Sequence, residues 1–381
     1  LKQLQQQSKQ EASQKKALPE SLEKFTTLAE EKDIIEVAEP LRALEAALAR
    51  DPDSKEAAAA LGAALKKMGA VMKAKIEERA DKADLKALLK ECEATITAGN
   101  RDFEKVYRAV WAVLQSGEEH LLPRFKQAVD ALLERIKKPN DKPEQRNEAK
   151  EPATLLADAA HTKPVFEVVA EHLATLGSGT RLEMQRVGDT DKHGHETSGL
   201  KKLQRVVEKA LLKPVGDATV GETDSVLDVV RAMIIVKDLG VVAAIVDGLK
   251  ALSDAELVDV LRLTNRFESP SAGGWRDLMI NLVIVGDERK HVCEIQIVHE
   301  MMLTARKGLP GHEIYRVVRN ATELIESCGL ENELRLARVK ILRDRSATDR
   351  ELLQQFEDGW ILEDAEWVEE VGSKEVLDRN S

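Results

Sequence analysis

Residues 277–285, DLMINLVIV, and residues 291–299, HVCEIQIVH, decide the fold of this chain. In both stretches apolar residues recur at every second position, which is the period of a β-strand with one face in a core. Residues 229–237 and 256–267 are also short and rich in β-branched or apolar residues, and residues 241–253 between them have the pattern of a helix. The sequence therefore predicts a strand, a helix and then three further strands.

Alternation divides each predicted strand into an apolar and a polar face. One face of 277–285 carries Leu278, Ile280, Leu282 and Ile284. In 256–267 we assign Leu257, Leu261 and Leu263 to the apolar face. If the strand registers align, the polar faces bring together Arg231, Lys237, Arg262, Arg266, Asn281, Glu294 and Gln296.

Two explanations of this polar face remain open. An antiparallel sheet commonly leaves one face in water, and charged residues then lie there only because they are solvated. The face nevertheless carries several cations and few carboxylates, in a chain whose formal net charge is -11. Such a surface suits a polyphosphate, neutralised partly by Arg and Lys and partly by a metal ion on carboxylates.

The residues before the predicted sheet are organised differently. We predict an all-helical bundle or array over 1–138, with a turn at Gly99 and Asn100, and a charged linker over 139–152. The α+β domain is expected over 153–346, with further helices before its mixed sheet, and an acidic extension over 347–381. Within it, the polar residues 189–198 are expected to form a loop. The predicted fold class is α+β.

Composition restricts the classes of function. At 381 residues the chain has room for two or three domains, and its acidic balance argues against general binding to nucleic acid. No stretch reaches the ~18 apolar residues of a membrane span, and the three cysteines lack the spacing of a zinc site or a disulfide framework. We expect a soluble, intracellular protein. Because the chain begins at Leu1, we expect a truncated or processed N-terminus, which leaves an organellar location open.

The strands carry a set of motifs in a fixed order. These are DVVR at 228–231, RFESP at 266–270, GWRDL at 274–278 and CEIQI at 293–297. Together they resemble the RelA/SpoT alarmone synthetase domain, which has a nucleotidyltransferase-like fold. The resemblance covers residues 200–327, about a third of the chain.

The resemblance implies a reaction, the transfer of pyrophosphate from ATP to the 3′-hydroxyl of GDP or GTP. It implies that Asp228 and Glu294 hold Mg²⁺ and that Glu294 also accepts the proton of the attacking hydroxyl. Gln296 would position the acceptor nucleotide, and Trp275, where the family has Tyr, would stack on guanine. The implied phosphate contacts are Arg231, Lys237, Arg266, Lys201, Lys202 and Arg205.

The sequence also departs from the family pattern. Met279 stands where the family has His, Val298 and His299 stand where it commonly has Arg-Thr, and Arg231 is two residues closer to Asp228 than usual. These departures favour the alternative, a catalytically inactive RelA/SpoT-like module. Such a module would be a structural or nucleotide-binding subunit of a larger protein assembly. In either case, the N-terminal helices are the part expected to bind a protein partner.

Overall fold

We describe the fold from a computed structural model of the chain. The structure describes residues 41–82 except 42 and 49, then 85–137, 143–190, 196–201, 203–212, 222–271 and 274–308. The predicted acidic extension and Lys202, one of the implied phosphate contacts, lie outside these residues. The division into domains remains a prediction.

A five-stranded mixed sheet forms the centre of the fold, in the order β1-β4-β7-β6-β5. Its strands are β1 (Arg181–Glu183), β4 (Arg231–Val236), β5 (Val258–Asn265), β6 (Leu278–Ile284) and β7 (Cys293–His299). The strands β4 and β7 are parallel, and the other neighbouring pairs are antiparallel. The predicted α+β class and the strand–helix–strand–strand–strand order are confirmed, while β1 is an edge strand that the sequence analysis did not predict.

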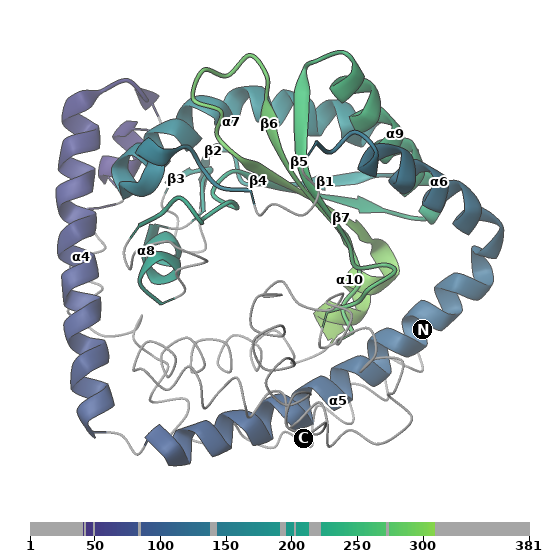
Figure 1. Cartoon of the computed structure of the whole chain (residues 1–381), viewed down its shortest axis with the longest axis horizontal. Helices are drawn as coiled ribbons and strands as arrows, with labels where there is room; N and C mark the ends of the chain where they lie inside the picture. The colour runs from purple at the N-terminus through teal and green to yellow at the C-terminus, as the bar shows by residue number, and fades with distance from the viewer. Residues whose placement is uncertain are drawn as a thin grey trace, which may run out of the picture.

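The apolar face of the sheet is covered by helices α7 (Pro152–Thr175) and α9 (Leu239–Asp254), which lie on one side of it (Figure 1). Leu278, Ile280 and Leu282 of β6 are fully buried there, as the alternation predicted. Helix α9 begins where the side chain of Asp238 accepts a hydrogen bond from the Val241 N–H at 2.8 Å, an ordinary N-cap. These contacts fix the polar face of the sheet on the opposite side.

Other helices lie around that polar side (Figure 1). They are α4 (Lys55–Lys82), α5 (Leu85–Gly117), α8 (Leu203–Leu212) and α10 (Glu300–Gly308). The short helices η2 (Glu119–Leu121) and α6 (Leu122–Leu133) follow α5, and α6 packs on α9. A second, two-stranded sheet pairs β2 (Val187–Thr190) with β3 (Glu196–Ser198). No helix among the described residues is both long and apolar enough to cross a membrane.

The face assignment of β5 was partly wrong, because the strand contains a β-bulge between Val260 and Arg262. A bulge inserts one residue, so side chains before it change faces relative to those after it. Val258 and Val260 are therefore the buried residues, while Leu257 is 55% exposed. After the bulge Arg262 pairs with Asn281, so it lies on the polar face as predicted.

Two predictions of local structure were also wrong. The expected turn at Gly99 and Asn100 lies inside the continuous helix α5. Gly costs only about 1 kcal/mol in a helix and Asn less, which a long helix can absorb. The expected loop at 189–198 contains the end of β2 and the whole of β3, whose pairing supplies partners for their backbone groups. In the predicted charged linker, Gln145 and Ala149 are buried, and residues Asn147–Lys150 form the short helix η3.

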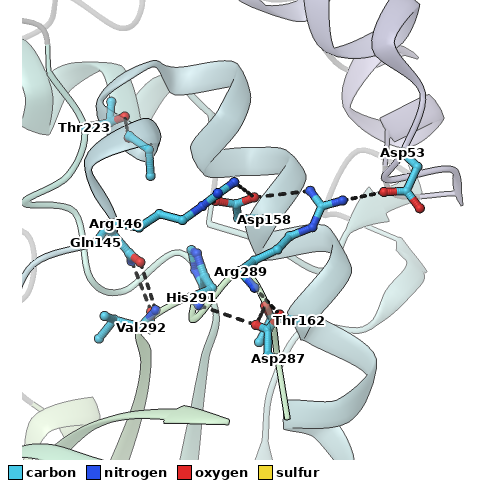
Figure 2. A network of polar contacts seen from close by, with 11 residues as sticks. Asp53, Gln145, Arg146, Asp158, Thr162, Thr223, Asp287, Arg289, His291 and Val292 are labelled. Carbon is cyan, nitrogen blue, oxygen red and sulfur yellow. Dashed lines mark hydrogen bonds and ion pairs between the residues drawn. The ribbon is translucent and has the colours of Figure 1, made fainter. Parts of the chain in front are cut away.

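A network of polar side chains holds the loop that leads into β7 (Figure 2). Asp158 of α7 is 1% exposed and accepts hydrogen bonds from Arg146 at 2.6 and 2.8 Å and from Arg289 at 3.2 Å. Arg289 also forms an ion pair with Asp53, which precedes α4. In the same loop, Asp287 accepts a hydrogen bond from Thr162. The network therefore connects α7, the segment before it and the residues before α4 to the start of β7.

Candidate functional site

The site begins where β4 and β7 lie side by side. Their parallel register places Arg231 opposite Glu294, and the Glu294 N–H donates to the Val230 carbonyl at 3.0 Å. On the other side of β7, Glu294 is opposite Asn281 of β6. Since paired residues share a face of the sheet, Arg231, Glu294 and Asn281 all lie on the polar face.

Asp228, just before β4, is the centre of a cluster of cations. Its carboxylate accepts from the Lys201 ammonium and from Lys209 Nζ at 3.0 Å, and Arg231 Nη1 lies 3.8 Å away. Lys201 is held there by its backbone N–H, which donates to the Val229 carbonyl at 3.0 Å. Lys201 and Asp228 are both buried, each 9% exposed. The cluster contains more positive than negative charge, even when Glu294 is included.

The protonation of this cluster follows from burial and from its close charges. Burial alone would raise the pKa of Asp228, but Lys209 and Lys201 outweigh it and hold that pKa well below its usual range. Burial lowers the pKa of Lys201 to about 7, although the attraction of Asp228 opposes this shift. For Lys209, attraction to Asp228 overcomes burial and raises its pKa. Because burial disfavours the charged form of Lys201, a second anion close to its ammonium group would stabilise that form.

The pKa of Glu294 shifts in the opposite direction to the pKa of Asp228. Burial, and next the negative charge of Asp228, raise its pKa to about 7, although Lys209 and Arg231 oppose the change. A carboxyl group with a pKa near 7 can exchange a proton at neutral pH, which is the property required of a general acid or base. Arg231 is opposite Glu294 in the sheet and its Nη1 lies 3.8 Å from Asp228, so both carboxyl groups lie next to Arg231.

A second cluster lies on the same face, centred on Asp277, the residue before β6. Its side chain is completely buried and accepts from Trp275 Nε1 at 2.7 Å, from Arg266 Nη1 at 3.3 Å and from the side-chain amide of Gln296. Gln296 follows Glu294 by two residues, so both side chains point to the polar face of β7. The two clusters are therefore neighbours, about 7 Å apart along the strand.

Trp275 is packed between helices α5 and α10. Its ring contacts Tyr107 edge-on, with ring centroids 5.5 Å apart, and the Arg306 guanidinium lies 5.1 Å from the ring centroid. Burial raises the pKa of Tyr107 to about 12, so its hydroxyl stays neutral at physiological pH. A nucleotide base that stacks on the Trp275 ring must displace Arg306 or use the opposite face of the indole.

The turn before Trp275 requires glycine at position 274. Gly274 has φ +81°, and a Cβ added there would lie 3.1 Å from the backbone Cα of Glu104 in α5. We expect Gly274→Ala to lower the free energy of unfolding by about 1–2 kcal/mol, because both the positive φ and the close helix oppose a side chain. Urea unfolding measures this loss. Gly286→Ala is the control, since no atom lies near its added Cβ; equal losses in the two variants would contradict the explanation.

The structure brings together most, but not all, of the predicted site residues. Asp228, Arg231 and Glu294 form one cluster, and Gln296, Arg266 and Trp275 meet at Asp277. Lys237 follows the far end of β4, about 20 Å along the strand from Arg231, so it is not part of either cluster.

Lys209 and Asp277 were missed as site residues. Lys201, Arg205 and Lys209 recur at intervals of four, the spacing of one helix face, and this signal could have identified Lys209. For Asp277 the sequence offers only a polar residue on the correct strand face. Its role is visible only from its three donors.

The residues fit a magnesium ion that arrives with phosphates. Among the described residues no group of three His, Cys, Asp or Glu side chains forms a metal site. Mg²⁺ is, however, commonly held by one or two carboxylates together with substrate phosphates, and Asp228 and Glu294 could supply these carboxylates. Both oxygens of Asp228 accept from lysines here, so a lysine would have to move to a phosphate for Asp228 to bind the ion.

Comparisons with solved structures find alarmone synthetases. Small alarmone synthetase 1 from Bacillus subtilis, bound to its product pppGpp, is 14% identical with a TM-score of 0.30, over 50% of this chain and 98% of that one. Small alarmone synthetase 2 from Bacillus subtilis is 17% identical with a TM-score of 0.29, over 50% and 96%.

A GTP pyrophosphokinase family protein from Streptococcus pneumoniae also matches, at 13% identity and a TM-score of 0.26, over 49% of this chain and 91% of that one. No family model and no curated protein matches the chain. At TM-scores of 0.30, 0.29 and 0.26, the similarity to these three structures carries no argument about this chain. The RelA/SpoT-like domain stays a prediction, and the function has to be argued from the residues of this chain.

Proposed function

We propose that this RelA/SpoT-like chain binds ATP together with GDP or GTP on the polar face of its sheet and transfers pyrophosphate between them with Mg²⁺. The observation that carries the proposal is the meeting of Asp228 and Glu294 with Lys201, Lys209 and Arg231 at the adjacent starts of β4 and β7. Cations in this number and a pair of carboxylates are what a metal-bound polyphosphate requires.

The burial of Lys201 and Asp228 supports a role in binding rather than simple solvation. Lys201 is 9% exposed, whereas a lysine on a wet sheet face normally extends into water. Burying a cation is unfavourable unless anions compensate it, and Asp228 must compensate Lys201 and Lys209 together. A triphosphate bound here would supply the missing negative charge. This favours the functional explanation of the polar face over the solvated one.

In the proposed reaction the side chains of the protein transfer one proton and stabilise charge on the phosphates. In the transfer, the oxygen of the acceptor 3′-hydroxyl forms a bond to the β-phosphorus of ATP, and the bond from that phosphorus to AMP breaks. Glu294 takes the hydroxyl proton, since its pKa of about 7 lets it do so at neutral pH. Lys201, Lys209 and Arg231 stabilise charge on the phosphate oxygens. A magnesium ion on Asp228 and Glu294 would supply further charge stabilisation.

A second candidate is a nucleotide-binding module without catalysis, serving as a subunit of a larger assembly. Two observations favour it. Both oxygens of Asp228 are taken by lysines, and Arg306 covers the Trp275 ring on which guanine would stack. In this case nucleotides bind through the cations, but Asp228 and Glu294 do not hold a metal ion.

The test compares binding with turnover in the full chain. Calorimetric titration with ATP, GDP and GTP, with and without Mg²⁺, measures binding, and chromatography of ATP plus GDP or GTP detects a guanosine 3′-pyrophosphate. Binding with product formation supports transfer. Binding without product at high protein concentration supports the silent module, and absence of binding to all three nucleotides overturns both.

A further inference from the structure

The buried carboxylate of Asp277 has no role in the proposed reaction, yet it contacts three residues to which the family resemblance assigns nucleotide contacts. Its Oδ2 accepts from Trp275 Nε1 at 2.7 Å and from the Gln296 amide, and its Oδ1 lies 3.3 Å from Arg266 Nη1. Asp277 is completely buried, so it does not itself reach a ligand on the surface. Any effect on a ligand must pass through the residues that donate to it.

We propose that Asp277 is the positioning residue of the acceptor-nucleotide subsite, and that it orients Gln296 to accept a hydrogen bond from the guanine nucleotide. This inference rests on the proposed function, because it specifies how one substrate of the same site is recognised. The inference gives Asp277 a role in the selectivity of the acceptor subsite for the guanine nucleotide over ATP.

The orientation of Gln296 follows from hydrogen-bond chemistry. A carboxylate can only accept, so the amide nitrogen of Gln296, and not its carbonyl oxygen, must face Asp277. The carbonyl oxygen Oε1 is then at the end of the amide directed away from Asp277. Gln296 therefore offers an acceptor, which selects a donor group on the ligand, such as a hydroxyl or a ring N–H.

The position of Gln296 fits the acceptor nucleotide rather than the donor. Gln296 lies two residues beyond Glu294 on the same strand face, on the side away from the start of β4 where Asp228 and the cations gather. Glu294, the proposed base, thus separates the phosphate-binding cations from Gln296 and Trp275. A nucleotide that presents its hydroxyl to Glu294 would place its sugar and base on the Gln296 side.

Arg266 and Trp275 each have a second contact besides the Asp277 carboxylate, as expected around a residue that positions its neighbours. The backbone N–H of Arg266 donates to the Asp277 carbonyl at 2.9 Å while its side chain reaches the carboxylate. Trp275 is fixed both by Asp277 and by its contact with Tyr107. A leucine side chain in place of Asp277 would keep nearly the same shape but accepts no hydrogen bond, so Trp275, Gln296 and Arg266 would each lose this acceptor.

The test is a double-mutant cycle between Asp277 and Gln296. Asp277→Leu should weaken GDP binding at least about ten-fold, since Gln296 loses the acceptor that orients it, and leave ATP binding within about two-fold. If Asp277 acts through Gln296, the double variant Asp277→Leu with Gln296→Ala should bind GDP within about three-fold of Gln296→Ala alone.

Asp259→Asn is the matched control, because Asp259 lies on β5 and forms an ion pair with Lys137 at 3.5 Å, outside both clusters. Calorimetry with GDP and ATP measures each variant, and the Trp275 indole N–H resonance, assigned with Trp275→Phe, reports its hydrogen bond to Asp277 without any nucleotide. Equal losses for GDP and ATP, or a further large loss of GDP affinity in the double variant, would overturn the positioning role. A wild-type chain that binds neither nucleotide would instead overturn the proposed function, and an unmoved indole resonance in Asp277→Leu would overturn the inference independently.

Discussion

Glu294→Gln should reduce pyrophosphate transfer about 10³-fold while leaving nucleotide binding nearly intact when binding is measured without Mg²⁺. The substitution keeps the shape of the side chain and removes its ability to take a proton, and general-base catalysis typically contributes 10²–10⁴-fold. Loss of the negative charge next to Arg231 should not weaken phosphate binding, because the local positive charge increases. Product formation from ATP and GDP, together with calorimetric binding of each nucleotide, measures the two effects separately.

The matched control is Glu288→Gln, an exposed glutamate in the loop that leads into β7. It should leave turnover unchanged. If Glu294→Gln retained more than about a tenth of the wild-type rate, Glu294 would not be the base. If it lost nucleotide binding to the same extent as turnover, Glu294 would act in binding rather than in proton transfer.

The raised pKa of Glu294 also predicts a dependence on pH. Transfer requires the ionised carboxylate, which in the chain without Mg²⁺ forms as the pH rises through about 7, so the rate should rise with pH. Stability should change in the opposite direction. A carboxyl group whose pKa is raised on folding contributes stability that is fully present below its ordinary pKa and is lost as the pH rises through about 7. Glu294→Gln should remove this loss in urea unfolding; an unchanged pH dependence in the variant would contradict the assignment.

Asp158→Asn should cost about 3 kcal/mol of unfolding free energy, the largest effect on stability that we predict. Asp158 is 1% exposed and accepts a bidentate pair of hydrogen bonds from Arg146 and another from Arg289 (Figure 2). Removing one partner of a buried ion pair typically costs about 3–5 kcal/mol, and the partial exposure of both arginines favours the lower end. Urea unfolding measures the change.

Asp247→Asn is the control for this prediction, because it also removes an aspartate that pairs with an arginine, but on the surface. Exposed ion pairs contribute little, so this variant should unfold almost as the wild type does. A similar cost for the two variants would mean that the network around Asp158 does not hold the loop. Because that loop leads directly into Glu294, we also expect Asp158→Asn to weaken nucleotide binding.

The amino-acid sequence determined the class of the fold and the faces of most of its strands. The alternation in 277–285 and 291–299 predicted which side chains of β6 and β7 are buried, because a strand side chain has only two directions available. The same rule placed Arg231, Glu294 and Gln296 on one face. Where β5 contains a bulge the rule failed, since one inserted residue reverses the alternation and has no local signature in the sequence.

Only the tertiary structure decided how those residues act together. Asp228 meets Lys209, and Asp277 meets Gln296, across distances in the sequence that no local pattern describes. The pairing depends on strand register and on the position of α8, both set by the packing of the whole domain. The same packing places Lys237 at the far end of β4, because a strand spaces its residues by about 3.3 Å even when they share a face. Local sequence thus determines which way a side chain points, and the fold determines what it meets.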